Sequence, residues 1–188
     1  MQVIDLINTI EVIFEKNIGN KERGILNKYK ELKGVSNAHL NTFEKELSIV
    51  FPNDFREYYG IKNGSKDLHL LHIIIQGDSY ATFKMLSLGD IRTSRKNIFE
   101  SIEGAENDYR NIDERIKQEG LNEKKIPFSK NADGSIYLMM DFDPSGKGKD
   151  GQIICYVHDP DYLYYIAPTF REVLENTIEN LKKIKSTK

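Results

Sequence analysis

The stretch IPFSKNADGSIYLMMDFDPSGKGKDGQIICYVHD, residues 126–159, contains apolar segments separated by polar, glycine-containing ones. Residues 125–130, 135–142 and 152–159 are rich in branched and aromatic side chains, which favour β-strands. The segment 131–134 (NADG) and the longer DFDPSGKGKDGQ carry Asp, Asn, Gly and Pro, which are typical of turns. We therefore expect three consecutive antiparallel strands here.

The last two of these strands have two different faces. If Asp143 lies opposite Gln152, side-chain alternation divides their residues into two sets. One set is uniformly apolar and is expected to face the core: Ile136, Leu138, Met140, Phe142, Ile153, Cys155 and Val157. The other set mixes aromatic and ionisable groups: Tyr137, Met139, Asp141, Asp143, Ile154, Tyr156 and His158. Such a face is either half covered by another element or offered to a partner.

Helical periodicity and turn signals organise the rest of the chain. The expected helices are 2–16, one capped by Ser36 and broken by Pro52, a short one capped by Asn53 or Asp54 that ends at Asn63-Gly64, a polar stretch from Asp90 or Thr93 to Gly120 with a break near Gly104, and a final one capped by Thr169. Residues 19–34 are expected to form a connection with at most a short helical turn. The segments 68–76 and 80–88 predict a hairpin, and 162–167 predicts another strand.

Helices at both ends with hairpin-connected strands between them indicate an α+β fold. We expect a single domain with a central, mainly antiparallel sheet, N-terminal helices and a C-terminal helix packed against it. The length of 188 residues suits one core better than two.

The composition excludes several classes of function. A net charge of -2 gives no excess of basic residues for nucleic-acid binding. No apolar run approaches the roughly 18 residues of a membrane span. Cys155 is the only cysteine, so no internal disulfide forms, and the N-terminus lacks the basic start of a signal peptide. We expect a cytoplasmic protein.

The loop DFDPSGKGKDGQ partly matches a calcium-binding loop. Asp141, Asp143, Ser145 and Gly146 occupy its first, third, fifth and sixth places, but Gln152 stands where a bidentate Glu closes the loop. The flanking segments read as strands rather than helices. The glycines also fail to match a phosphate-binding loop, and no helix follows them. We expect a turn, with no metal or other cofactor.

The sequence shows no catalytic constellation. Cys155 and His158 lie three residues apart in a predicted strand, so their side chains point to opposite faces of the sheet. His69 and His72 have the same spacing and are expected to face apart as structural residues. We therefore do not expect an enzyme.

Four blocks in the sequence carry a resemblance to a known family. FPNDFREYYGIKNGS, MLSLGDI, the opening stretch and APTFREVLENTIENL occur in the order typical of the SUKH superfamily. This superfamily includes fungal cell-wall-assembly regulators and many bacterial immunity proteins. The resemblance covers about residues 36–184. It implies one SUKH-like domain over 1–188, with a helical extension at 1–35 and a helical insertion at about 90–122.

The resemblance implies binding rather than catalysis. Bacterial members resemble antidotes that occlude the active site of a polymorphic secreted toxin, often a nuclease. The expected function is therefore an immunity-type protein that binds and neutralises a cognate toxin domain. The alternatives are a regulatory scaffold of cell-wall or envelope assembly, as the fungal relatives suggest, and a hydrolase that depends on His158 or Asp141.

Several aspartates lie between residues 133 and 161 and could form an acidic rim that steers a basic toxin. Aspartate is also common in turns for local reasons, and this reading remains open. The expected partner-binding residues are Asp133, Tyr137, Asp141, Asp143, Asp150, Tyr156, His158, Asp159 and Asp161. The sequence leaves the oligomeric state open.

Overall fold

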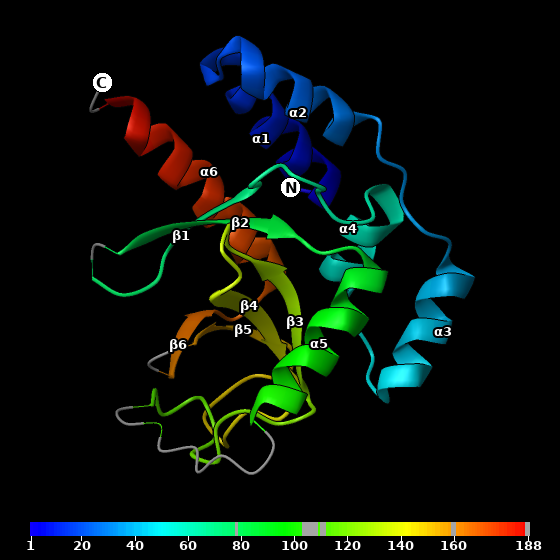
Figure 1. Cartoon of the computed structure of the whole chain (residues 1–188), viewed down its shortest axis with the longest axis vertical. Helices are drawn as coiled ribbons and strands as arrows, with labels where there is room; N and C mark the ends of the chain where they lie inside the picture. The colour runs from blue at the N-terminus through cyan, green and yellow to red at the C-terminus, as the bar shows by residue number, and fades with distance from the viewer. Residues whose placement is uncertain (78, 103–108, 110–111, 159–160, 187–188) are drawn as a thin grey trace.

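A computed structural model describes the chain except for residues 78, 103–108, 110–111, 159–160 and 187–188. The described residues form six helices and six strands (Figure 1). In chain order these are α1 Val3–Asn17, α2 Asn20–Lys30, α3 Asn37–Leu47, α4 Asn53–Ile61, β1 Leu71–Ile74, β2 Tyr80–Met85, α5 Leu88–Ile102, β3 Lys125–Lys130, β4 Ile136–Asp141, β5 Gln152–Val157, β6 Tyr162–Ala167 and α6 Phe170–Ser186.

The six strands form one curled sheet in the order of the chain, from β1 to β6, with every neighbouring pair antiparallel. Helix α6 packs against β1, β5 and β6, while α1 and α4 pack against α6 and against each other. The helices of the N-terminal and C-terminal segments thus cover the same face of the sheet (Figure 1). The expected α+β fold is confirmed.

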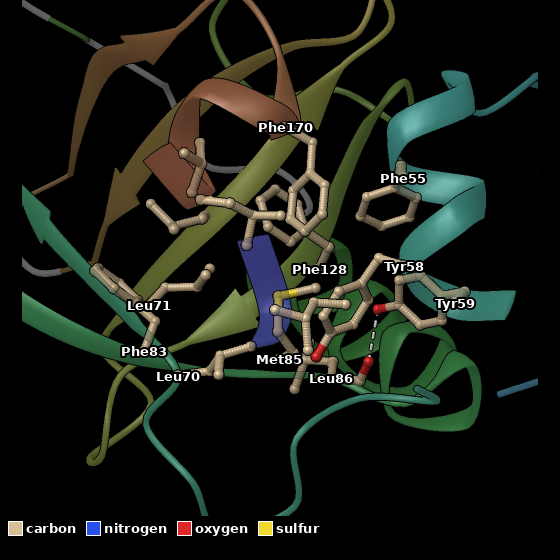
Figure 2. Close-up of a cluster of buried hydrophobic side chains, with 14 of the residues drawn as sticks. Phe55, Tyr58, Tyr59, Leu70, Leu71, Phe83, Met85, Leu86, Phe128 and Phe170 are labelled. Carbon is tan, nitrogen blue, oxygen red and sulfur yellow. Dashed lines mark hydrogen bonds between the residues drawn. The ribbon is translucent and has the colours of Figure 1, made fainter. Parts of the chain in front are cut away.

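The main core lies between this helical layer and the sheet, and we call it the first core. Figure 2 shows aromatic side chains from α4 and α6 meeting side chains from the strands. The Phe55 ring lies edge-on to Phe128 of β3 at 5.5 Å and to Phe170 of α6 at 5.2 Å. The Tyr59 hydroxyl donates to the Leu86 carbonyl at 2.6 Å, so this buried polar group is satisfied.

A smaller second core lies on the other face of the sheet. Met139, Ile154 and Tyr156 pack there against Ile98 of α5 and against Tyr109, Ile116 and Leu121 of the segment that follows α5. The middle of the mixed face expected from the sequence is therefore covered by the chain itself.

Two helix caps were predicted correctly. The Ser36 side chain accepts a hydrogen bond from the His39 amide at the start of α3. The Thr169 hydroxyl accepts one from the Glu172 amide at 3.2 Å at the start of α6. The expected role of Asp54 was wrong: α4 begins after Pro52, and the Asp54 carboxylate accepts from the Arg171 amide of α6 at 2.7 Å.

Two helical predictions were also wrong. Residues 19–34 contain the complete helix α2, because Leu26 and Tyr29 find buried positions in the first core. The predicted continuation of helix to Gly120 fails over 112–124, which are turns and irregular structure. Ile116 and Leu121 of this segment are buried in the second core, where they pack against the sheet as irregular chain.

The strand register differs from the expected one. Asp141, rather than Asp143, lies opposite Gln152. A shift of two residues leaves every side chain on its predicted face, because alternation has a period of two. The hairpin strands β1 and β2 are also shorter than expected.

Candidate functional site

The predicted partner-binding residues fall at two opposite ends of the sheet. In the register of β4 and β5, Ile136 lies opposite Val157 and Asp141 lies opposite Gln152. A six-residue strand spans about 20 Å, so the two ends are well separated. We call them the Asp150 end, with Asp141, Asp143 and Asp150, and the His158 end, with Asp133, Tyr137, Tyr156, His158 and Asp161. Asp159 lies outside the described residues.

Asp141 is fully buried at the Asp150 end. Its carboxylate lies 3.3 Å from the Lys125 ammonium, and both side chains are 0% exposed. It also accepts hydrogen bonds from the Asp143 amide at 3.0 Å and the Gln152 side-chain amide at 3.1 Å. The expectation that this acid is presented to a partner was wrong, because the carboxylate joins β3, β4 and the loop between β4 and β5.

Asp143 is half-buried and has its own partners. It pairs with the Lys117 ammonium and accepts from the Asn122 side-chain amide at 2.9 Å. The bond to Lys117 holds the pKa of the Asp143 carboxyl below its usual value. This acid therefore fastens the segment after α5 to the loop 141–152.

The loop 141–152 is fixed along its length. The Arg115 carbonyl accepts from the Ser145 amide at 3.2 Å and from the Gln152 side-chain amide at 2.8 Å. At Gly148 a β-carbon would lie 2.3 Å from that same carbonyl oxygen. The loop approaches its neighbour so closely that only glycine fits there.

The acids of the partial calcium pattern in this loop pair with lysines of the protein itself. Lys125 faces Asp141 and Lys117 faces Asp143, the residues at the first and third ligand places. Within the described residues no group of three or more His, Cys, Asp or Glu side chains is arranged to hold a metal ion.

A surface groove of about 590 Å³ opens beside this loop. Its lining residues are Asn41, Glu44, Lys45, Ser48, Ile49, Val50, Lys124, Phe142 and Asp150. Val50 is 76% exposed, the most exposed of the large apolar side chains described. Of the predicted residues whose placement is described, only Asp150 lines this groove.

The position of Val50 follows from the end of α3. Ser48 has φ 53°, a left-handed conformation that stops the helix, and the Lys124 ammonium donates to its carbonyl at 2.8 Å. The Glu44 carboxylate accepts from the Phe51 amide at 2.8 Å and pairs with Arg56. These contacts fix both sides of the Ser48–Phe51 turn and leave Val50 in solvent. We did not predict this groove from the sequence, because the helix break at Pro52 was the only signal near it.

The His158 end holds a different set of contacts. The Tyr156 hydroxyl donates to the Asp161 carboxylate at 2.9 Å, and His158 Nδ1 lies 3.1 Å from both groups. Burial, together with the nearby Asp161, raises the pKa of Tyr156 far above its usual value. Tyr156 is therefore a protonated donor in the second core, while His158 and Asp133 are exposed.

The family model described as SMI1 / KNR4 family (SUKH-1) matches residues 34–176, about three quarters of the chain. The chain belongs to the SUKH-1 family. Comparison with curated proteins gave no match. The SUKH family includes toxin immunity proteins and SMI1/KNR4-like members, and its proteins bind partners such as toxins.

The match begins at residue 34, after α1 and α2. In this SUKH-1 protein α1 nevertheless supplies Val3, Leu6 and Ile10 to the first core. In the described part of the chain, no helix combines the length and apolarity that crossing a membrane requires.

The cysteine and three of the histidines of this SUKH-1 chain lie in different surroundings. Cys155 lies in the first core, where burial raises the pKa of its thiol far above the usual range. His158 contacts Tyr156 of the second core, so the predicted separation from Cys155 is confirmed.

The prediction that His69 and His72 face apart was wrong. Both line one pocket of about 310 Å³, because β1 begins only at Leu71 and alternation does not extend to His69.

Proposed function

We propose that this protein is an immunity-type binding protein that neutralises a cognate toxin domain, with a nuclease as the expected class of toxin. The observation that carries the proposal is the SUKH-1 match over residues 34–176, since the SUKH family includes toxin immunity proteins. The cytoplasmic location expected from the sequence belongs to this proposal, because an antidote must meet its toxin inside the cell it protects.

The groove beside Val50 is the contact surface that this function requires. Protein interfaces combine an apolar centre with a polar rim. Val50, Ile49 and Phe142 supply the apolar centre of the groove. Lys45, Lys124 and Asp150 lie around it as charged groups. The toxin domain would place an apolar side chain against Val50 and a basic one against Asp150.

The other predicted residues take two roles in the proposal. Asp133, Tyr137, His158 and Asp161 form a second contact region at the His158 end, whose acids attract a basic toxin. Asp141, Asp143 and Tyr156 act indirectly, because they hold the loop and the sheet in shape.

Binding to the toxin domain encoded beside the gene tests the proposal. The purified proteins would be mixed and their affinity measured by calorimetry, with toxin activity followed in parallel. Val50→Glu and Asp150→Lys should each weaken binding at least about tenfold, equivalent to about 1.4 kcal/mol. Val12→Glu is the matched control, because Val12 is exposed at 45% on α1, away from the groove.

The outcomes distinguish the proposed function from the proposed binding surface. Failure of the wild-type protein to bind or inhibit any neighbouring toxin would contradict the proposed function. Normal binding by both groove variants would show that the groove is not the contact surface, while the proposed function would stand. The affinity of Asp133→Lys would then test the His158 end.

A regulatory scaffold of envelope assembly is the second candidate, supported by the SMI1/KNR4-like members of the family. Affinity purification from cells in which wall-synthesis enzymes dominate would favour it over a toxin antidote. The hydrolase alternative, which depends on His158 or Asp141, lacks support at Asp141, because this carboxylate is buried and paired with Lys125.

A further inference from the structure

Two lysines lie directly opposite each other where β2 pairs with β3. The Cα partners in this short pairing are Lys84 with Lys130 and Met85 with Ser129. Phe83 and Met85 point into the first core, so alternation places Lys84 on the other face of the sheet, and Lys130 shares that face. Like charges directly opposite each other destabilise a sheet, because their Cβ atoms are only about 5 Å apart. An anion between the two ammonium groups would remove this repulsion.

A third lysine, Lys66, lines the same pocket, which has a volume of about 280 Å³. The loop that carries Lys66 is fastened to the end of β2. The fully buried Ser65 donates its amide to the Met85 carbonyl at 2.9 Å, and its hydroxyl accepts from the Met85 amide at 2.8 Å. Lys66 itself has φ 50°, a left-handed conformation that is uncommon outside glycine. The backbone of all three lysines is therefore held in place.

Two aspartates also line the pocket, and one of them already has a structural role. The Asp90 carboxylate accepts from the Ser87 hydroxyl at 2.6 Å and from the Ser87 amide at 3.3 Å, next to the start of α5. Asp67 is exposed. Within the described residues, no acid forms an ion pair with any of the three lysines. With three lysines against two aspartates, the pocket favours a negatively charged ligand.

A neutral donor lies beside the lysines. The Asn63 side-chain oxygen accepts from the Leu88 amide at 3.0 Å, so the NH₂ group is the part of this side chain that can donate to a ligand. At the neighbouring Gly64 a β-carbon would lie 2.8 Å from the Ser87 amide nitrogen, which shows how closely this loop approaches the chain after β2. The pocket is thus built before any ligand binds, and such preorganisation lowers the entropic cost of binding.

We propose that this pocket binds a phosphate group, with the ammonium groups of Lys66, Lys84 and Lys130 contacting its oxygens. A phosphate group carries about 1.5 to 2 negative charges at neutral pH and has three acceptor oxygens, which matches three ammonium groups. A carboxylate offers one charge and two oxygens. The volume of about 280 Å³ lies at the small end of ligand pockets, so the ligand is a small molecule.

This inference goes beyond the proposed binding of a toxin. None of the residues that line this pocket lines the groove beside Val50. Variants of the lysines and variants of the groove therefore test the two proposals separately.

Calorimetry with sodium phosphate measures the binding directly. At constant ionic strength in chloride buffer, the full-length protein should bind one phosphate per chain with a Kd below about 1 mM. Lys84→Gln and Lys130→Gln should each weaken binding at least about tenfold, because each removes a charge-assisted contact. Lys149→Gln is the matched control and should bind as the wild type does. Lys149 is an exposed lysine of the loop 141–152, at the opposite end of β4 from the partner of Lys130.

Two further probes define the chemistry of the ligand. Acetate, a carboxylate with a single charge, should bind at least about tenfold more weakly than phosphate. Adenosine monophosphate distinguishes the two sources of a phosphate group. Equal affinity for this ester and for inorganic phosphate would assign the pocket to the free ion, whereas tighter binding of the ester would assign it to a phosphorylated molecule.

Amide chemical shifts locate the site without any variant. Addition of phosphate to the wild-type protein should move the NMR signals of Lys66 and Ser87 and leave that of Lys149 unchanged. This measurement holds even if a lysine variant fails to fold, which circular dichroism would show.

A wild-type protein that binds neither phosphate nor adenosine monophosphate with a Kd below about 1 mM would overturn the proposal. Equal weakening by Lys149→Gln and Lys84→Gln, or acetate binding as tight as that of phosphate, would also overturn it. Binding of an RNA oligonucleotide by a chain that binds neither small anion would count against it in the same way.

Discussion

The Lys125 ammonium and the Asp141 carboxylate face each other at 3.3 Å across the neighbouring strands β3 and β4, and neither side chain is exposed. The pair lies at the point where the loop 141–152 leaves the sheet. It explains how a loop with the composition of an ion-binding site holds its shape through the protein's own charges.

Removing Asp141 should therefore destabilise the protein strongly. Asp141→Ala leaves the Lys125 ammonium buried without a counter-charge, and we expect the free energy of unfolding to fall by about 3–5 kcal/mol. Urea unfolding at neutral pH measures this change. Asp150→Ala, at an exposed position of the same loop, should change stability by no more than about 0.5 kcal/mol.

A double variant isolates the cost of the unpaired charge. Lys125→Met with Asp141→Asn removes both charges and keeps an oxygen that accepts from the Asp143 amide. It should be more stable than Asp141→Ala. A loss for Asp141→Ala no larger than that for Asp150→Ala would contradict the role given to the pair.

Two glycines of the loop should respond differently to the same substitution. At Gly148 a β-carbon would lie 2.3 Å from the Arg115 carbonyl oxygen and 2.6 Å from Pro144, whereas at Gly146 nothing lies within 4 Å. Gly148→Ala should cost about 1–3 kcal/mol, as overpacking usually does. Gly146→Ala should be close to neutral, and equal thermal midpoints for the two variants would refute the close approach.

The hydrogen bond between the His72 amide of β1 and the Thr177 hydroxyl of α6 should be measurable as stability. Thr177→Val removes the acceptor of the His72 amide and leaves this part-buried donor without it, at an expected cost of about 1–3 kcal/mol. Thr177→Ser keeps the hydroxyl and should lose less. Hydrogen exchange supplies a direct measurement, because the His72 amide should exchange faster in Thr177→Val only.

His72 should make the protein less stable in mild acid. Burial lowers the pKa of His72 from 6.5 to about 4. As the pH falls below 6.5, His72 binds a proton in the unfolded state but not in the folded state, where protonation begins only near pH 4. Stability should therefore decline between these values, by about 3 kcal/mol in all.

Replacement of the ring removes this dependence. His72→Phe should flatten the decline in the free energy of unfolding between pH 6.5 and 4, measured by urea titration at several pH values. A decline as steep as that of the wild type would show that other groups cause it.

Local sequence signals predicted the features that depend on neighbouring residues. Ser36 and Thr169 cap helices because their hydroxyls reach amides three residues ahead. The two faces of β4 and β5 were also correct despite a register error of two residues, since only an odd shift exchanges the faces.

The features that failed depend on distant residues. Asp54 caps α6, a helix more than a hundred residues away in the chain, although its position in the sequence suggested α4. Helix α2 forms because Leu26 and Tyr29 are buried by other elements, which a Lys-rich and glycine-containing segment does not reveal. The two histidines of the 310 Å³ pocket meet only because β1 starts late.

The sequence by itself determined the fold class, the order of the strands along the chain, and the family resemblance, because these follow from periodicity, turn residues and motif order. The tertiary structure alone decided which acids are exposed. Asp141 is buried against Lys125, whereas Asp150 lines the groove with Val50. In the sequence, Asp141, Asp143 and Asp150 of this loop look alike. The reason is physical: the exposure and pairing of a charged side chain depend on what other segments bring within a few ångströms of it.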